Sequence, residues 1–275
     1  MKEKLNIGLL VRVSFKKFNP IKQNKAMKNN YASANGSDAS MYGATTRMVS
    51  KVFIDPLQKL ETECRTIVER YTLPWEDRGN RLLPAKNVPK LQEELANVRK
   101  RWDYAVEDYI VEWDKIVADA QSRLNGDFNY DNYPAVETVK ARFTMQTVFM
   151  PMPDNSRLVE EIRDEMEDIF SDRMKSASQN LRTRLVDKLA HLAAKCAEAE
   201  DGEKTRFYSS NIDNVIELCK AIPDMLIEDD KELTDAVESA ERLLAGLDAD
   251  DIKHSPDLAR DVRDRAKAIV DSIKL

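Results

Sequence analysis

The sequence predicts a mainly helical protein: a long antiparallel hairpin of coiled-coil-like helices, a small two-stranded β-sheet and a C-terminal helical bundle. Three observations predict this fold class. The 275 residues include only 7 Gly, and 33% are charged, which is typical of long solvated helices. Two long segments repeat apolar residues at spacings of three and four. Two shorter segments alternate apolar and polar residues, as strands with one buried face do.

The first strand is expected near the N-terminus, from Leu5 to Phe15. Odd positions in this segment are apolar, whereas even positions include Arg12 and Ser14, so one face of the strand is expected to be buried. Residues 16 to 40 lose the alternation and are rich in Lys, Asn and Ser. This composition predicts a long loop, part of it disordered.

Helix start signals follow this loop. Asp38 or Ser40 is expected to begin a short helix, and Asp55 before Pro56 is expected to begin a second helix that ends near residue 71. The next stretch, TLPWEDRGNRLLPAKN, contains two prolines and a glycine. It is therefore interpreted as a connection between two helices.

A long helix is expected over residues 88–124, because Pro89 follows a helix-start signal and no Gly or Pro occurs after it. Its apolar residues advance by three or four with one stutter, which is a near-heptad stripe. The stripe consists of Leu91, Leu95, Val98, Trp102, Ala105, Tyr109, Trp113, Ile116 and Ala120. We expect this face to be buried.

A second strand is expected over residues 142–150, where apolar and polar residues alternate before Pro151. Two isolated strands are marginal alone, so this strand is expected to pair with the first. A helix over residues 156–200 is interpreted as the antiparallel mate of the 88–124 helix. Its expected cap is one of three residues, Asp154, Asn155 or Ser156.

Three shorter helices are expected after Asp201-Gly202, over residues 209–222, 229–245 and 255–274. The sequence thus divides into a domain over 1–200, which contains the strands, the hairpin and the basic loop 16–40, and a C-terminal helical segment over 201–275. No repeat of 20 to 50 residues is present, so a solenoid is not expected.

The charge is unevenly distributed along the chain. The formal net charge is −6, yet residues 1–60 contain eleven Lys or Arg and three acidic residues. Six of these cations form the candidate contact site: Arg12, Lys16, Lys17, Lys22, Lys25 and Lys28. Three interpretations stay open: a solvated loop facing acidic helices of the same or a neighbouring subunit, contact with nucleic acid, or contact with another protein's acidic surface.

No catalytic, cofactor-binding or metal-binding residues are expected. His191 and His254 are the two histidines, and Asp187 before His191 is interpreted as a surface salt bridge. Neither GxxxxGK[ST] nor GxGxxG occurs. Three cysteines without paired spacing predict reduced, packed thiols in a cytoplasmic protein. The chain contains no apolar run that spans a membrane, and no signal peptide is expected.

Methionines beside the second strand, Met145, Met150 and Met152, are interpreted as exposed. If one face of the small sheet is uncovered, they form a candidate protein-binding surface. An uncovered edge strand is also expected to favour assembly with a second copy.

The order of elements carries a family resemblance. It rests on LNIGLLVRVSF, IDPLQKLETECRTIVERYTLPW, EDYIVEWDKIV and ARFTMQTVFMPM. With the long acidic helix after them, these segments resemble an uncharacterised family of phage and prophage proteins, often encoded near MoxR-type AAA+ ATPases. The similarity covers about residues 5 to 200. It implies a phage protein in the host cytoplasm and an AAA+ ATPase as a partner, and it supplies no catalytic residues.

Two functions are therefore expected. The first is a non-enzymatic structural or interaction protein of the phage type, which self-associates as a homo-oligomer and binds a partner protein as an adaptor. The alternative is a nucleic-acid-binding accessory factor in phage replication or recombination that uses the basic loop. An enzyme with a dispersed carboxylate site is the least favoured reading.

Overall fold

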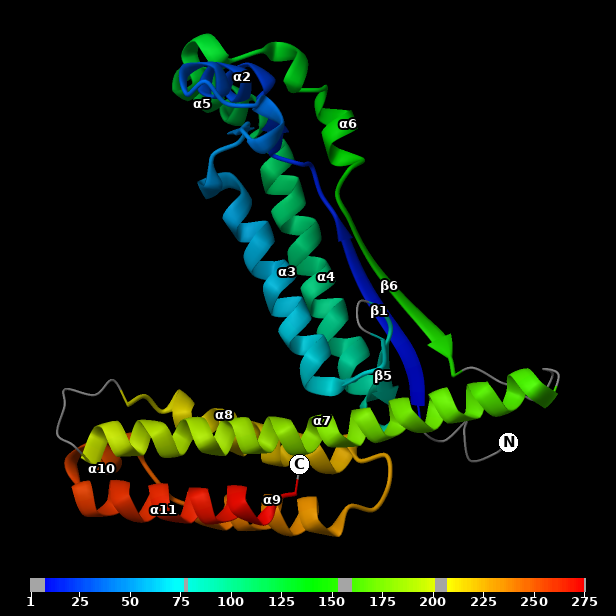
Figure 1. Cartoon of the computed structure of the whole chain (residues 1–275), viewed down its shortest axis with the longest axis vertical. Helices are drawn as coiled ribbons and strands as arrows, with labels where there is room; N and C mark the ends of the chain where they lie inside the picture. The colour runs from blue at the N-terminus through cyan, green and yellow to red at the C-terminus, as the bar shows by residue number, and fades with distance from the viewer. Residues whose placement is uncertain (1–7, 77–78, 153–159, 201–206, 275) are drawn as a thin grey trace. The chain divides into compact units, whose positions relative to one another are not determined.

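The computed structural model describes residues 8–76, 79–152, 160–200 and 207–274, with the backbone alone over 160–165. It is mainly helical with a small antiparallel sheet, as the sequence predicts (Figure 1). The strands are β1 (Gly8–Lys16), β2 (Ile21–Gln23), β3 (Thr45–Arg47), β4 (Leu73–Pro74), β5 (Arg81–Pro84) and β6 (Thr144–Pro151). The helices are α2 (Lys25–Ala34), α3 (Lys51–Tyr71), α4 (Val88–Val111), α5 (Trp113–Leu124), α6 (Val136–Lys140), α7 (Glu160–Glu200), α8 (Ser210–Met225), α9 (Lys231–Leu244), α10 (Ala249–His254) and α11 (Pro256–Ser272).

The contacts divide the chain into two units. Unit 1 contains residues 1–12, 68–92 and 148–275, and unit 2 contains residues 13–67 and 93–147. Four elements, β1, α3, α4 and β6, contribute residues to both units. None of these boundaries falls at residue 200, where the sequence analysis places one.

The main sheet has the strand order β4-β5-β1-β6. The predicted pairing of the two long strands is confirmed, since β1 and β6 are neighbours. The stretch after α3 that was interpreted as a connection does join α3 to α4, and it contains the short strands β4 and β5, which were not predicted. Leu73 pairs with Leu82, and both side chains are fully buried. Strands β4 and β5 are only two and four residues long. Burial of their apolar side chains stabilises them despite this short length.

Unit 1 is built around α7. Helix α7 packs on α8 and α11, and α9 packs on both of those helices. The predicted stripe of α7 is buried from Met174 to Cys196. The hairpin of this helix with the 88–124 helix is not confirmed, because α8 and α11 cover its apolar face. The residues proposed to begin and end α7, at 154–156 and 201–202, lie outside the described residues.

In unit 2, the described parts of α3 and α4 run antiparallel and side by side (Figure 1). Arg101 of α4 donates to Glu63 of α3 through two hydrogen bonds of 2.5 and 2.8 Å. The predicted 88–124 helix is divided at Glu112, where ψ is 5°. This division lies at the stutter between Tyr109 and Trp113. A stutter shifts the apolar stripe around a regular helix. A local change of helix geometry is therefore needed to keep both aromatic residues on the buried face.

Two predicted helix limits were wrong. Helix α3 begins at Lys51, so Pro56 lies inside it. Pro56 has no N–H to donate to the carbonyl oxygen of Val52, four residues earlier. Val52 is exposed in the first turn of α3, so water can reach that oxygen instead. Helix α8 continues past Pro223 to Met225, whose side chain is fully buried. Helix α10 was not predicted.

Candidate interaction surfaces

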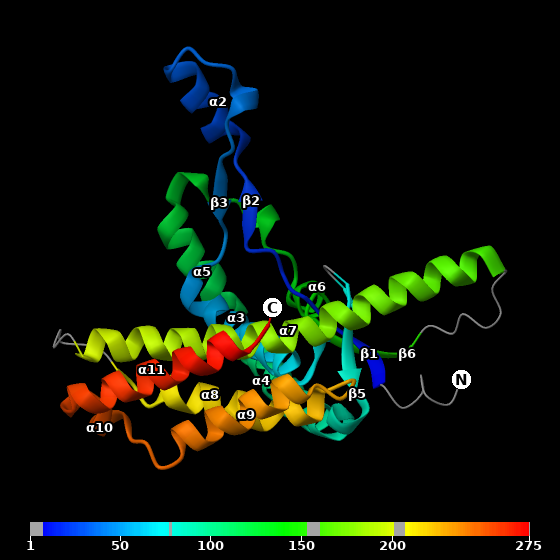
Figure 2. The ribbon, with the colours of Figure 1, turned by 60° about the horizontal axis from the view of Figure 1, so that its bottom comes forward.

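Residues 17–50 form a small substructure of unit 2, which we call the arm. The sequence predicted a long loop over residues 16–40, and this prediction was wrong. Strand β2 pairs with β3, from Ile21 with Arg47 to Gln23 with Thr45. Asn24 caps α2 by accepting a hydrogen bond from the Met27 amide at 2.9 Å. Figure 2 shows α2 at the end of the β2–β3 ribbon.

Large apolar side chains are exposed on the arm. Met27 is 50% exposed, Tyr31 58% and Met41 81%. Met27 and Tyr31 are four residues apart on α2, so they share one face of that helix. The ring of Tyr31 meets that of Tyr42 edge-on at 5.1 Å between centroids. Methionine and tyrosine are enriched in the centres of protein interfaces, so this apolar patch is a candidate interface.

The six predicted cations have different neighbours in the structure. Arg12 is exposed on β1 and belongs to unit 1, whereas the five lysines belong to unit 2. Lys17 forms an ion pair with Glu61, and Lys22 donates to the Asn132 side chain. Lys16 lines a groove described below. These cations therefore differ in their surroundings within the described chain.

Helix α2 carries the remaining two lysines. Lys25 is exposed and Lys28 half-buried, and within the described chain neither forms an ion pair. The pKa of Asp38 is lowered, first by the hydrogen bonds from Ser40 and further by the charge of Lys28. The charge of Lys28 thus acts on a carboxylate of the arm.

Arg47 was not among the predicted cations, although it belongs with them. It is exposed on β3, directly opposite Ile21 of β2, and forms no ion pair in the described part of the chain. The pairing of β2 with β3 places Arg47 on the same ribbon as Lys22, although the two side chains point to opposite faces. The sequence offers no strong signal for that pairing, because each strand has three mostly exposed residues.

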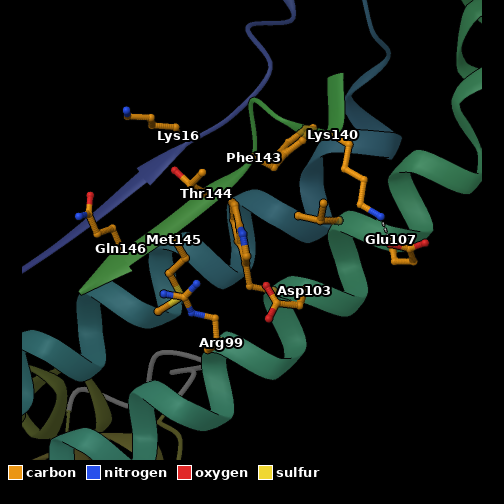
Figure 3. Close-up of a pocket in the computed structure, with 11 residues that line it drawn as sticks. Lys16, Arg99, Asp103, Glu107, Lys140, Phe143, Thr144, Met145 and Gln146 are labelled. Carbon is orange, nitrogen blue, oxygen red and sulfur yellow. Dashed lines mark hydrogen bonds and ion pairs between the residues drawn. The ribbon is translucent and has the colours of Figure 1, made fainter. Parts of the chain in front are cut away.

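A groove of about 570 Å³ lies between α4 and the start of β6 in unit 2. We call it the α4–β6 groove, and Figure 3 shows its lining. It is lined by Lys16, Arg99, Trp102, Asp103, Val106, Glu107, Lys140, Phe143, Thr144, Met145 and Gln146. Trp102 and Met145 are 1% and 3% exposed, so they form an apolar base. Met145 was predicted to be exposed, which was wrong, because it points towards α4.

The charges of the α4–β6 groove are only partly paired. Lys140 donates to Glu107 at 3.0 Å. Arg99 is half-buried, extends from α4 towards Met145 (Figure 3), and has no carboxylate partner among the described residues. Arg99 was not singled out from the sequence, since one arginine on a charged helix carries no distinguishing signal.

The other two methionines of the predicted surface also differ from the expectation. Met150 and Met152 are half-buried and pack against the apolar core of unit 1. An exposed methionine surface beside β6 is therefore absent from the residues described.

Within the described ranges, no group of three or more His, Cys, Asp or Glu is arranged to hold a metal ion. His191 and His254 are both exposed. No ion pair joins Asp187 to His191 in this part of the chain, whereas His254 Nδ1 lies 2.7 Å from the carbonyl oxygen of Asp250. No described helix is both long enough and apolar enough to cross a membrane.

These observations define a mainly helical protein with a small antiparallel sheet, a basic arm and a groove beside a strand. No protein-family model matches the chain, and neither a curated protein nor a solved structure matches it.

Proposed function

We propose that the chain is a non-enzymatic structural and interaction protein that self-associates and binds a partner protein as an adaptor. The observation that carries this proposal is the apolar patch of Met27, Tyr31 and Met41 on the arm. Exposed Met and Tyr side chains surrounded by polar residues mark a surface suited to a protein partner.

A surface complementary to the arm is present on the same chain. Helix α9 carries three exposed carboxylates, Asp235, Glu238 and Glu241, at intervals of three residues. None of the three forms an ion pair within the part of the chain that the structure describes. Residues 207–274 contain 17 acidic and nine basic residues. A second copy therefore offers unpaired negative charge to Lys25 and Arg47 of the arm.

Contact of the arm of one copy with α9 of the next is heterologous, because the two surfaces differ. Such contacts produce closed rings or open filaments. Both products suit a structural role, and neither requires a catalytic residue.

Analytical ultracentrifugation tests this proposal. The triple variant Met27→Ala, Tyr31→Ala, Met41→Ala is expected to sediment as a monomer at concentrations where the wild type is oligomeric. Tyr104→Ala is the matched control, because Tyr104 is a 74% exposed tyrosine on α4, outside the arm. A wild-type protein that stays monomeric, or a triple variant that still assembles, contradicts the proposal.

The resemblance to the phage and prophage family makes an AAA+ ATPase in the host cytoplasm the first partner to test. Co-purification of the ATPase with the wild type, with the triple variant of the arm and with the Tyr104→Ala control measures whether the arm contributes to that complex.

One observation favours the alternative, a nucleic-acid-binding accessory factor. The β2–β3 ribbon carries Lys22 and Arg47, and a two-stranded ribbon is narrow enough for the major groove of DNA. This function predicts that one variant carrying Lys22→Glu, Lys25→Glu, Lys28→Glu and Arg47→Glu loses DNA binding in a gel-shift assay at low salt. Retention of binding in that variant, or no binding by the wild type, contradicts it.

A further inference from the structure

We propose that a pocket between α7 and α9 of one copy receives Met27 from the arm of the next copy. Lys28, beside Met27, then faces two unpaired carboxylates on the rim of that pocket. The pocket, which we call the α7–α9 pocket, has a volume of about 380 Å³ and lies wholly in unit 1. The inference rests on the self-association proposed above and names the contact through which it occurs. The lining consists of Ser178, Leu181, Arg182, Leu226, Glu228, Asp229, Asp230, Lys231, Glu232 and Leu233.

The base of the α7–α9 pocket is apolar. Leu181 of α7 and Leu233 of α9 are 1% and 0% exposed. Leu226, in the connection between α8 and α9, is half-buried and packs against the core of unit 1. A flexible, unbranched methionine side chain fills irregular apolar spaces of this kind. The pocket therefore suits one of the exposed methionines of the arm.

The rim of the pocket carries unpaired negative charge. Arg182 holds two of the four carboxylates, Asp230 at 2.9 Å and Glu232 at 3.4 Å. Glu228 and Asp229 are exposed, and neither forms an ion pair among the residues that the structure describes. The rim thus offers two carboxylates to a cation of another chain.

Among the exposed side chains of the arm, Met27 matches this pocket best. It lies between Lys25 and Lys28 in the first turn of α2, so cations flank the apolar side chain. Met41 is close in the sequence to Asp38, whose carboxylate would meet the negative rim. The tyrosine of the patch already packs edge-on against a second tyrosine of the arm. An apolar base with an acidic rim is complementary to an apolar side chain with basic neighbours.

The pocket adjoins the acidic surface of α9. Lys231 lines the pocket, and Asp235 follows it by four residues, on the same face of the helix. On α2, Lys25 lies three residues before Lys28, so these two side chains are also neighbours. One docked arm can therefore place Lys28 at the rim and Lys25 near Asp235. The charge of Lys231 opposes this attraction, but the unpaired carboxylates of the rim and of α9 outnumber it.

Sedimentation velocity of single variants tests the contact. Met27→Ala is expected to weaken self-association about tenfold, because a buried methionine side chain is lost from the interface. Ser178→Trp fills the pocket and is expected to be monomeric where the wild type is oligomeric. Glu228→Lys with Asp229→Lys reverses the rim at exposed positions, so it leaves the core unchanged, and it is also expected to be monomeric.

Asp213→Lys with Asp251→Lys is the matched control for the rim variant. It makes the same change of charge at two exposed positions that do not line the pocket. It is expected to assemble as the wild type does.

Mixing two variants separates this contact from self-association in general. Met27→Ala with Tyr31→Ala and Met41→Ala removes the apolar patch of the arm and keeps the pocket. Glu228→Lys with Asp229→Lys keeps the arm. Each protein is expected to be monomeric alone, whereas an equimolar mixture is expected to form a dimer in which one arm occupies one pocket.

The outcomes distinguish the two proposals. A monomeric wild type overturns both of them. Pocket variants that assemble as the wild type does, while the triple variant of the arm is monomeric, overturn the pocket contact alone. The pocket contact is also overturned if the mixture stays monomeric, or if the Asp213 and Asp251 control loses assembly as the rim variant does.

Discussion

Arg182 of α7 and Asp230 at the start of α9 form a two-point ion pair. Arg182 Nε donates to Asp230 Oδ2 and Nη2 donates to Oδ1, both at 2.9 Å. Asp230 also accepts from the Leu233 amide at 3.0 Å, so the same carboxylate caps α9. Burial opposes ionisation of Asp230, but the hydrogen bonds from Arg182 and Leu233 outweigh it, and its pKa is lowered. Asp230 therefore links α9 to the long helix of unit 1, and Glu232 of α9 accepts a longer hydrogen bond from Arg182 at 3.4 Å.

Asp230→Ala is expected to lower the free energy of unfolding by about 3 kcal/mol, because a helix cap and a charge-assisted pair are lost together. Asp230→Asn is expected to cost less, since asparagine still caps α9. Urea unfolding measures both. Asp271→Ala, at an exposed position of α11 outside the proposed assembly surfaces, is the control. A loss in Asp230→Ala no larger than in this control contradicts the role assigned to the pair.

The same pair predicts a pH dependence. The folded-state pKa of Asp230 lies below the unfolded value, which is about 3.9. Its contribution to stability is therefore fully present above the unfolded pKa and is lost as the pH falls through the folded pKa. The difference in unfolding free energy between wild type and Asp230→Ala is expected to shrink in acid. A difference that stays constant down to about pH 2 would argue against this linkage.

Gly8 is expected to tolerate no side chain. Its φ is 153°, and a Cβ atom there would lie 2.0 Å from the carbonyl oxygen of Leu83 on β5. Gly8→Ala is expected to destabilise the protein by about 2 kcal/mol or more, because either the strand pairing or the backbone must shift. Gly43→Ala is the control, since nothing lies within 4 Å of its Cβ position. Equal melting temperatures for the two variants would show that the close approach is absent.

The three cysteines are expected to be unreactive in the folded protein. All are free and buried, and burial raises the pKa of Cys64 and Cys196 to about 11 and that of Cys219 to about 12. At pH 8 the thiolate of such groups is about a thousandth of the total or less. A thiol reagent should label none of them until denaturant is added. Rapid labelling of any of the three thiols in the folded protein would contradict this prediction.

Local pattern predicted several elements of this fold. The alternation of β1 and β6 predicted two strands and their pairing, and the stripe of α7 predicted which side chains are buried from Met174 to Cys196. A stripe, however, defines a buried face and not the partner that covers it. The sequence therefore assigned the 88–124 helix to α7, whereas α8 and α11 cover that face.

The candidate surfaces were harder to predict for a similar reason. Strands β2 and β3 have three residues each, too few for a period to be recognised, so Arg47 was not connected with Lys22 and Lys25. The groove requires α4 and β6 to approach each other, although Arg99 and Met145 are far apart in the sequence. Local propensity carries no information about such contacts.

Compensating charge reversal at the arm and at α9 tests the central claim most directly. Self-association through these surfaces predicts that Lys25→Glu with Arg47→Glu is monomeric in sedimentation velocity, because the reversed arm repels α9 of the next copy. Addition of Asp235→Lys and Glu238→Lys to the same chain is expected to restore the oligomer. Assembly that survives the first pair of substitutions, or that does not return with the second pair, would contradict the account.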